Sequence, residues 1–283
     1  MAVEREFHCS DIKSDQLEKF KDYIADYSTV LIHGDCPRGS GTFVKIGSRF
    51  GVLTADHVVN EGKDAFNFNT GSSDRLGLTV VRGIVHNFWI EGQYIRPWSI
   101  AGLPYGQKGP DMVFLEILDQ GKLGSIKANR SFWDISSCML KEVSDELATC
   151  KCLWSIAGLP EELATEEEPH GGFTCVGGLP SQIYFGAIHM PPIERENYDY
   201  LQMDADYKLG DYLPTSFGGL SGGGLWCIPL DTASSDSEHL RFRSPKLAGL
   251  VYYQTRLKEG KRRLCCHGPK SIYCRLTEAI QDT

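Results

Sequence analysis

Short apolar runs separated by turn-forming residues fill the chain from residue 28 onward. The runs are rich in Val, Ile, Phe and Thr, as in "STVLIHG", "GTFVKIG" and "DMVFLEIL", and Gly, Pro, Asp and Ser lie between them. Turn signals that recur about every 8–12 residues are typical of a β-sandwich or β-barrel rather than of β–α–β units. A second series of such runs begins near residue 150. The pattern therefore predicts an all-β chain with two β-rich halves.

Both ends of the chain follow a helical pattern instead. Leu17, Phe20, Ile24 and Tyr27 share one face if residues 14–27 form a helix. We expect this helix to pack on the domain that follows it, and the alternative is an arm that docks a partner. The C-terminal stretch "SIYCRLTEAIQDT" is predicted to close the chain as a second helix.

These patterns divide the chain into four segments. They are an N-terminal helical extension (1–27), an N-terminal β-barrel (28–127), an inter-barrel linker (128–149), and a C-terminal β-barrel with the closing helix (150–283). A repeat of short period does not occur, which excludes solenoids and propellers.

The net charge of −8 disfavours a nucleic-acid partner, because phosphate binding usually appears as an excess of Lys and Arg. The same balance gives no reason to expect a membrane partner, and no run of about 18 apolar residues predicts a membrane-spanning helix. The N-terminal stretch lacks the apolar run of a signal peptide. With ten cysteines and no export signal, we expect a cytoplasmic protein whose thiols are reduced.

Two groups of cysteines raise the question of a zinc site. They are Cys150 with Cys152, and Cys265 and Cys266 with His267. Structural zinc sites use two ligand pairs, each with about two to four residues between the ligands, and these groups do not match that spacing. We interpret them as ordinary buried or exposed thiols and expect no metal.

The stretch "FGGLSGGGLW" surrounds Ser221 with five glycines. A serine hydroxyl is a weak nucleophile at neutral pH, so it needs a base to take its proton and a group that orients the base. His57, in "FGVLTADHVV", follows one apolar strand, and Asp111 begins another. A carboxylate at a buried strand is costly unless it is hydrogen-bonded or paired. Each residue alone is compatible with a structural role, but together they predict nucleophilic catalysis.

These motifs resemble those of the trypsin-like serine proteases, which have the chymotrypsin fold. "LTADH" resembles the T-A-x-H motif of the catalytic histidine, "DMVFLEI" the strand of the orienting aspartate, and "GGLSGGGLW" the G-x-S-G-G-P-L turn of the nucleophile. "KLAGLVYYQ" and "GPKSIYCRLTEAI" resemble the strand after the serine and the closing strand and helix, so the resemblance spans about residues 28–280. It implies two six-stranded antiparallel β-barrels, with His57 and Asp111 in the first and Ser221 in the second.

The resemblance also implies a role for each residue. His57 would act as general base and acid, Asp111 would orient it, and Ser221 would attack the substrate. The backbone N–H groups of Gly219 and Ser221 would form the oxyanion hole, which stabilises the negative oxygen of the tetrahedral intermediate. Neither a metal nor an organic cofactor is implied.

Leu220 departs from the zymogen-activated members of the family, in which an aspartate before the serine pairs with a newly cut N-terminus. Leucine cannot form that ion pair, so we do not expect activation by N-terminal cleavage. Bacterial relatives of the high-temperature-requirement type also lack the aspartate, and "VLTADHVV" is similar to their histidine motif. Those relatives carry PDZ domains after the protease, and we expect none here.

The family pattern places the residue that selects the substrate six positions before the serine, at Thr215. Threonine is neutral, so we do not expect the preference for Arg or Lys that an acidic group would confer. A small or medium neutral side chain is expected before the scissile bond. The expected wall residues of the pocket are Tyr252, Tyr253 and Gln254. Whether the acidic side chain of Asp206 or Asp211 also reaches the pocket stays open.

We therefore expect a cytoplasmic serine endopeptidase that acts on protein or peptide substrates. Because the zymogen switch is missing, we expect control by an activating protein partner, as in stand-alone bacterial proteases that resemble components of antiviral defence or signalling systems. The N-terminal helix is the candidate for this control. One alternative is a catalytically silent trypsin-like domain that acts as a binding or scaffold module. Another alternative is hydrolysis of esters or other acyl groups, although α/β-hydrolases have the chain order Ser, Asp, His.

Overall fold

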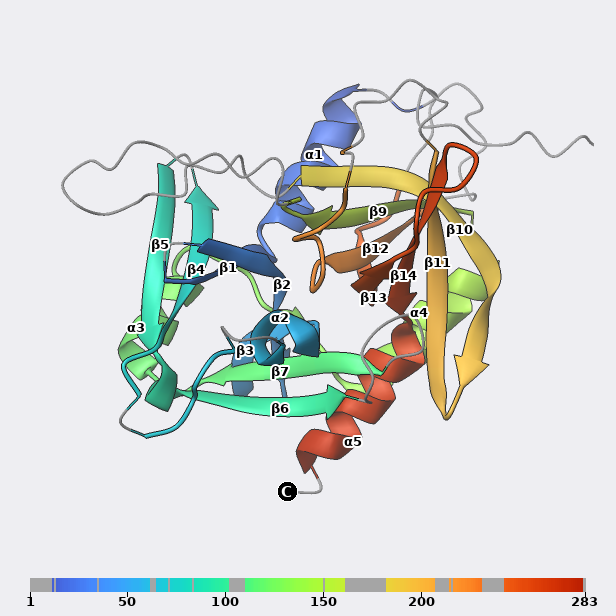
Figure 1. Cartoon of the computed structure of the whole chain (residues 1–283). Coiled ribbons are helices and arrows are strands. Elements are labelled where there is room, and N and C mark those ends of the chain that lie inside the picture. Colours follow the sequence, from blue (N-terminus) through green and yellow to red (C-terminus); the bar gives the residue numbers. More distant parts are fainter. Residues whose placement is uncertain are drawn as a thin grey trace, which may run out of the picture.

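The structure, a computed structural model, shows two β-sheet units side by side, with helices at both ends of the chain (Figure 1). The residues that it describes are 12, 14–34, 36–61, 65–70, 72–82, 84–101, 110–149, 151–160, 182–206, 214, 216–230 and 242–281. No helix among these residues is both long and apolar enough to cross a membrane.

The N-terminal unit is an antiparallel sheet whose seven main strands pair in the order β5-β4-β1-β2-β3-β7-β6. The strands are β1 (Ser28–His33), β2 (Cys36–Ile46), β3 (Arg49–Thr54), β4 (Arg75–Arg82), β5 (Ile84–Glu91), β6 (Ile95–Ala101) and β7 (Asp111–Ile117). A two-residue strand, β8 (Trp133–Asp134), pairs in parallel with β2. The unit thus has one main strand more than the six expected from the sequence.

The additional strand comes from the run "LGLTVVRGIVH", which has the pattern of a single apolar segment. The structure divides the run between β4 and β5, which form an antiparallel pair that ends with Arg82 opposite Ile84. Gly83 separates the two strands in the sequence.

The C-terminal unit is a closed six-stranded barrel in the order β10-β11-β14-β13-β12-β9. Its strands are β9 (Cys152–Gly158), β10 (Gln182–Arg195), β11 (Tyr198–Asp206), β12 (Gly224–Pro229), β13 (Lys246–Gln254) and β14 (Lys261–His267). All six pair antiparallel with their neighbours, which confirms the barrel predicted for this half.

Helices connect the strands and close both ends of the chain. They are α1 (Ser14–Ala25), α2 (Asp56–Asn60), α3 (Gln120–Lys127), α4 (Ser137–Thr149) and α5 (Leu276–Gln281), with a 3₁₀ turn η2 (Gly92–Tyr94) and a π-helical turn η5 (Ser271–Arg275). Two antiparallel units with a helix at each end form the chymotrypsin fold, as the sequence predicts. The predicted linker holds β8 and α4.

Helix α1 packs on the rest of the protein through its apolar face, as predicted. Ile24 is fully buried, and Phe20 makes an edge-to-face contact with Phe242 of the C-terminal half, with ring centroids 5.4 Å apart. On the other side, the carbonyl of Tyr27 just after the helix accepts the N–H of Phe43 in β2 at 2.7 Å. The helix therefore contributes to the core of the protein and contacts both halves.

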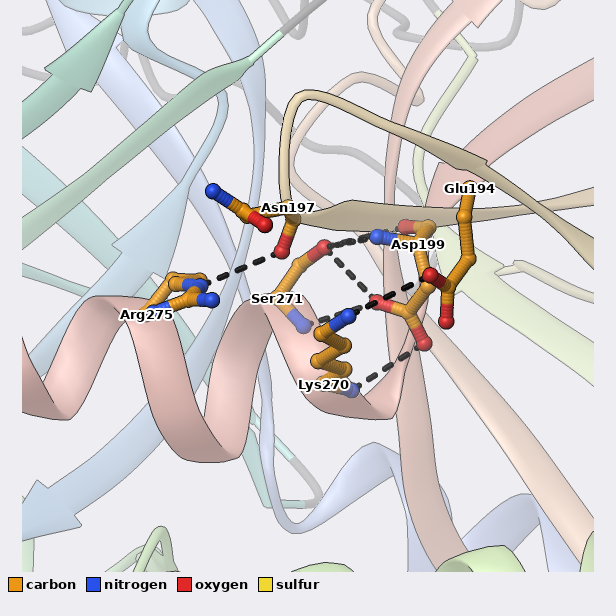
Figure 2. Close-up of polar contacts among 6 residues, drawn as sticks. All are labelled: Glu194, Asn197, Asp199, Lys270, Ser271 and Arg275. Atoms are coloured by element: carbon orange, nitrogen blue, oxygen red, sulfur yellow. Dashed lines mark hydrogen bonds and ion pairs between the residues drawn. The ribbon is translucent and has the colours of Figure 1, made fainter.

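The C-terminal helical segment is attached to the β10–β11 hairpin through the buried carboxylate of Asp199 (Figure 2). One carboxylate oxygen accepts the N–H and the hydroxyl of Ser271, both at 2.7 Å, and the other accepts the N–H of Lys270 at 3.1 Å. Arg275 donates to the carbonyl of Asn197 in the hairpin at 3.1 Å. A carboxylate is favourable here because the first N–H groups of a helix lack partners within it.

Candidate active site

The structure brings His57 and Asp111 into direct contact. His57 lies in α2, which follows β3, and Asp111 is the first residue of β7, which pairs with β3. One carboxylate oxygen of Asp111 accepts the backbone N–H of His57 at 3.0 Å, and the other lies 2.6 Å from Nδ1 of its ring. The carboxylate is 1% exposed. Two contacts with one residue fix both the position and the orientation of the imidazole.

The environment of His57 acts on its pKa in two directions. Burial by itself lowers the pKa, because the charged ring loses water. The hydrogen bond to Asp111 and the negative charge of that carboxylate outweigh burial, so the pKa is raised above the usual 6.5. In the neutral ring Nδ1–H donates to Asp111, and Nε2 is the atom that can accept a proton.

A second histidine lies behind the carboxylate. His267, at the end of β14, is fully buried, and its Nε2 accepts the backbone N–H of Asp111 at 3.1 Å. Its ring packs on Tyr252, with centroids 4.4 Å apart. Because Nε2 accepts a hydrogen bond, the ring is neutral and carries its proton on Nδ1. Burial lowers the pKa of His267 to about 4, although the charge of Asp111 acts in the opposite direction.

We expect His267 to make the folded state less stable as the pH falls from about 6.5 to about 4. In this range the unfolded chain takes up a proton at His267 and the folded chain does not, so protons favour unfolding. The lowering of the pKa from 6.5 to about 4 corresponds to about 3 kcal/mol of unfolding free energy. Urea unfolding of wild type and His267→Gln across this range measures the effect, because glutamine can accept the Asp111 N–H but does not titrate.

The stability advantage of wild type over His267→Gln should decrease by up to about 3 kcal/mol toward the acid end of the range. Parallel stability curves for the two proteins would contradict the prediction.

The backbone N–H groups in the turn around Ser221 fall into two sets. Those of Leu220, Gly222 and Gly223 donate to backbone carbonyls within the turn or in β13, at 2.7–3.1 Å. Those of Gly219 and Ser221 donate to no other residue that the structure describes. The two groups that the sequence predicts as oxyanion-hole donors are thus the two that the local backbone leaves available.

Two glycines of this turn adopt conformations that other residues avoid. The φ angle is +83° at Gly219 and +89° at Gly222. At Gly222 a Cβ atom would also lie 2.0 Å from the carbonyl oxygen of Ser40 and 2.1 Å from Oγ1 of Thr54. Glycine is therefore required there both by conformation and by the close approach of the N-terminal unit.

The nucleophile turn contacts the N-terminal unit beside the strand that leads into His57. The N–H of Ser40 in β2 donates to the carbonyl of Ser221 at 2.9 Å. Thr54, three residues before His57, donates its hydroxyl to the carbonyl of Ser40 at 2.7 Å. The hydroxyl of Ser221 makes no hydrogen bond with a described residue, His57 included. Helix α2 accordingly lies between the two units (Figure 1).

A cavity of about 210 Å³ adjoins the turn on the side of Gly219. Residues of both units line it, namely Val30, Pro37, Arg38, Gly39, Leu159 and Gly219. Gly219 thus belongs both to the wall of this cavity and to the predicted oxyanion hole.

The predicted specificity residues fall into different environments. Thr215 and Asp211 lie outside the described residues, as does the side chain of Asp206. The ring of Tyr252 is buried against His267, so a contact of this residue with substrate would come from its backbone. The side chain of Tyr253 is half-buried. The neutral pocket expected from the sequence stays a prediction.

Gln254 instead holds the segment that leads into the nucleophile turn. Its Oε1 accepts the N–H of Phe217 at 2.9 Å, and its Nε2 donates to the hydroxyl of Ser216 at 3.1 Å. Arg262 of β14 also donates to Oε1. The side chain thus links β13 and β14 to the start of the turn.

Sequence reasoning did not identify Ser40 or His267 as parts of this site. A signal for Ser40 was present in "GSG", because glycines inside a strand often mark a close approach of another backbone. His267 follows Cys265 and Cys266, both buried in β14, and this run was considered only as a possible metal site. Its contact with Asp111 joins positions 156 residues apart, which a local pattern cannot show.

No protein-family model and no curated protein matches the chain. Among solved structures the chain is similar to one named kallikrein-related peptidase 10, with a TM-score of 0.47 and 12% sequence identity. The match covers 91% of this chain and 96% of the other.

Proposed function

We propose that the protein is a serine endopeptidase that cleaves protein substrates through His57, Asp111 and Ser221. The observation that carries the proposal is the contact of 2.6 Å between the buried carboxylate of Asp111 and Nδ1 of His57. A buried aspartate that orients a histidine, and a serine in a turn that is bonded to the strands beside that histidine and has two available N–H groups, are the parts that acyl transfer requires.

In the proposed reaction, His57, Asp111 and Ser221 first carry out acylation. Nε2 of His57 takes the hydroxyl proton of Ser221 while the serine oxygen forms a bond with the carbonyl carbon of the scissile peptide. The electron pair of the carbonyl moves to its oxygen, and the N–H groups of Gly219 and Ser221 stabilise the negative charge. When the C–N bond breaks, the electron pair returns to the carbonyl, and His57 gives its proton to the leaving amine.

Deacylation repeats the same steps with water. His57 takes a proton from water, whose oxygen attacks the ester carbon of the acyl-enzyme, and the ester bond to Ser221 then breaks. The proton returns to the serine oxygen and the acid product leaves. Throughout both halves, the carboxylate of Asp111 stabilises the positive charge that His57 acquires, which is the effect that raises its pKa.

The catalytically silent module remains the second candidate from the sequence, and ester hydrolysis the third. A silent module has no need for a carboxylate that is 1% exposed and paired with a histidine, because burying a charge is costly. The cytoplasmic location, the activating protein partner and a role in defence or signalling are further parts of the proposal. They rest on the sequence, and the packing of α1 in the core argues against that helix as a detachable activator contact.

A fluorophosphonate probe tests the proposal directly. We expect the folded protein to be phosphonylated on Ser221, as located by peptide mass spectrometry, and protein unfolded in urea to remain unlabelled. The rate should fall as the pH drops through the pKa of His57, which lies above 6.5, because protonated Nε2 cannot take the serine proton. A folded protein without label on Ser221 would favour the silent module.

A further inference from the structure

Ser40 connects the nucleophile turn to the rest of the site through every polar group that it has. It lies in β2 of the N-terminal unit and is fully buried. Its N–H donates to the carbonyl of Ser221 at 2.9 Å, and its hydroxyl donates to the carbonyl of Gly219 at 2.7 Å. The hydroxyl also accepts the N–H of Leu159 at 3.0 Å. One residue thus holds the carbonyls of both predicted oxyanion-hole residues.

These contacts restrain the peptide groups that carry the oxyanion donors. A carbonyl and the following N–H belong to one rigid plane, so fixing the carbonyl of Gly219 fixes the plane that joins it to Leu220. The carbonyl of Ser221 is fixed in the same way. The N–H of Ser221 lies on the peptide between these two restrained planes, and the N–H of Gly219 lies on the peptide just before them.

Gly219 is the point at which such a restraint has the largest effect. Its φ angle of +83° is one of several that glycine can adopt at similar energy, so the conformation of its peptide depends on hydrogen bonds. The N–H end of the Gly219–Leu220 peptide donates to the carbonyl of Phe217 at 3.1 Å, and the hydroxyl of Ser40 holds its carbonyl end. Its neighbour Leu220 is fully buried and apolar, and therefore offers no polar side chain as an anchor. The hydroxyl of Ser40 is the side-chain group that binds the carbonyl of Gly219 in the part of the chain that the structure describes.

We propose that Ser40 is a positioning residue that holds the oxyanion hole in its active conformation from the opposite β-unit. The inference rests on the proposed function, because an oxyanion hole matters only if Ser221 attacks a carbonyl or an equivalent centre. Ser40 contacts neither the His57 ring nor the carboxylate of Asp111, so it acts on transition-state stabilisation and leaves the base unchanged.

The test compares phosphonylation of Ser221 by a fluorophosphonate in wild type, Ser40→Ala and Ser40→Cys, each as the full chain. Removing an oxyanion-hole donor typically slows an enzyme about 10²–10³-fold. Ser40→Ala leaves the donors present but loosely held, so we expect a rate about 10–100 times lower. Ser40→Cys fills the same place with a weaker donor and should react at an intermediate rate. The pH at which the rate is half-maximal should not change, because His57 keeps its partners.

Ser155→Ala is the matched control. Ser155 lies in β9, is fully buried, and its hydroxyl has no hydrogen-bond partner among the described residues. The same loss of a buried hydroxyl should therefore leave the labelling rate within about twofold of wild type. Thermal unfolding of each protein shows that the rates refer to folded molecules. If Ser40 had a merely structural role, Ser40→Ala would lower the unfolding midpoint while the folded protein kept the wild-type labelling rate. A shifted pH profile would mean that the substitution acts on His57 instead.

The outcomes separate this inference from the proposed function. If wild type is labelled on Ser221 and folded Ser40→Ala is labelled equally fast, the proposed role of Ser40 is overturned and the proposed function is left intact. If Ser40→Ala does not fold, a folded Ser40→Cys protein with the wild-type rate has the same meaning. Wild type that is not labelled on Ser221 would overturn the function and this inference with it.

Discussion

Replacing Ser221 by alanine is expected to lower turnover about 10⁶-fold, which in practice abolishes it. The alanine variant lacks the oxygen that forms the acyl-enzyme, and His57 and Asp111 cannot act without it. The fold should survive, because the backbone carbonyl of residue 221 still accepts the N–H of Ser40 and the lost hydroxyl has no partner among the described residues. Proteome-wide mapping of new N-termini, with wild type against Ser221→Ala, measures the effect and identifies the cleaved sequences.

Ser125→Ala provides the control for this comparison. Ser125 lies on the exposed side of α3, where its hydroxyl donates only to the carbonyl of Gly121. The Ser125→Ala variant should cleave the same sites at the wild-type rate. Equal cleavage by wild type and Ser221→Ala would reject Ser221 as the nucleophile. A wild type that hydrolyses simple esters but no protein would favour ester hydrolysis as the function.

Replacing Asp111 by asparagine should lower kcat about 10⁴-fold. The two carboxylate oxygens accept the backbone N–H of His57 and its Nδ1–H, and asparagine offers only one oxygen for these two donors. If that oxygen accepts the backbone N–H, the amide N–H₂ of asparagine points at Nδ1. The ring must then carry its proton on Nε2, where it can no longer accept the proton of Ser221.

The same variant should lower the pKa of His57, which gives an independent readout. Burial remains and lowers the pKa, whereas the charge and the hydrogen bond that raise it are lost. An NMR titration of the ring should therefore show its protonation at a lower pH than in wild type. Asp119→Asn is the matched control, since Asp119 caps α3 at a distance from the site and asparagine caps equally well. An unchanged pKa in Asp111→Asn would contradict the assignment of Asp111 as orienter.

Much of the fold follows from local patterns along the chain. The alternation of apolar runs and turn residues predicted the two β-units, and the spacing of Leu17, Phe20 and Ile24 predicted α1. The resemblance implied six strands for the first unit, which has seven main strands. The run that holds β4 and β5 is continuous in apolar character, and only the pairing of the two strands shows where the chain reverses. The hydrophobic pattern predicts which residues are buried, but it does not predict where the chain turns.

The residues of the candidate site also fall into two groups, those that the local sequence predicts and those that depend on a distant partner. Ser221 and the glycines around it were visible in the sequence because their conformations restrict residue type locally, as at Gly219 and Gly222. Ser40 was not visible as part of the site, and Gln254 was expected only as a wall of the substrate pocket, since serine and glutamine occur in many environments. Their functions depend on a partner from a different strand, such as Gly219 for Ser40, 179 residues away.

The sequence by itself therefore determined the fold class, the terminal helices and the three residues on which a catalytic hypothesis depends. Only the tertiary structure decided that Asp111 contacts His57, that His267 supports this aspartate from the core, and that Ser40 holds the nucleophile turn. The physical reason is the range of the interactions. Helix and strand patterns arise from neighbours along the chain, whereas a hydrogen bond of about 3 Å between residues far apart in sequence exists only once the strands that carry them have been brought together, within one sheet or between the two.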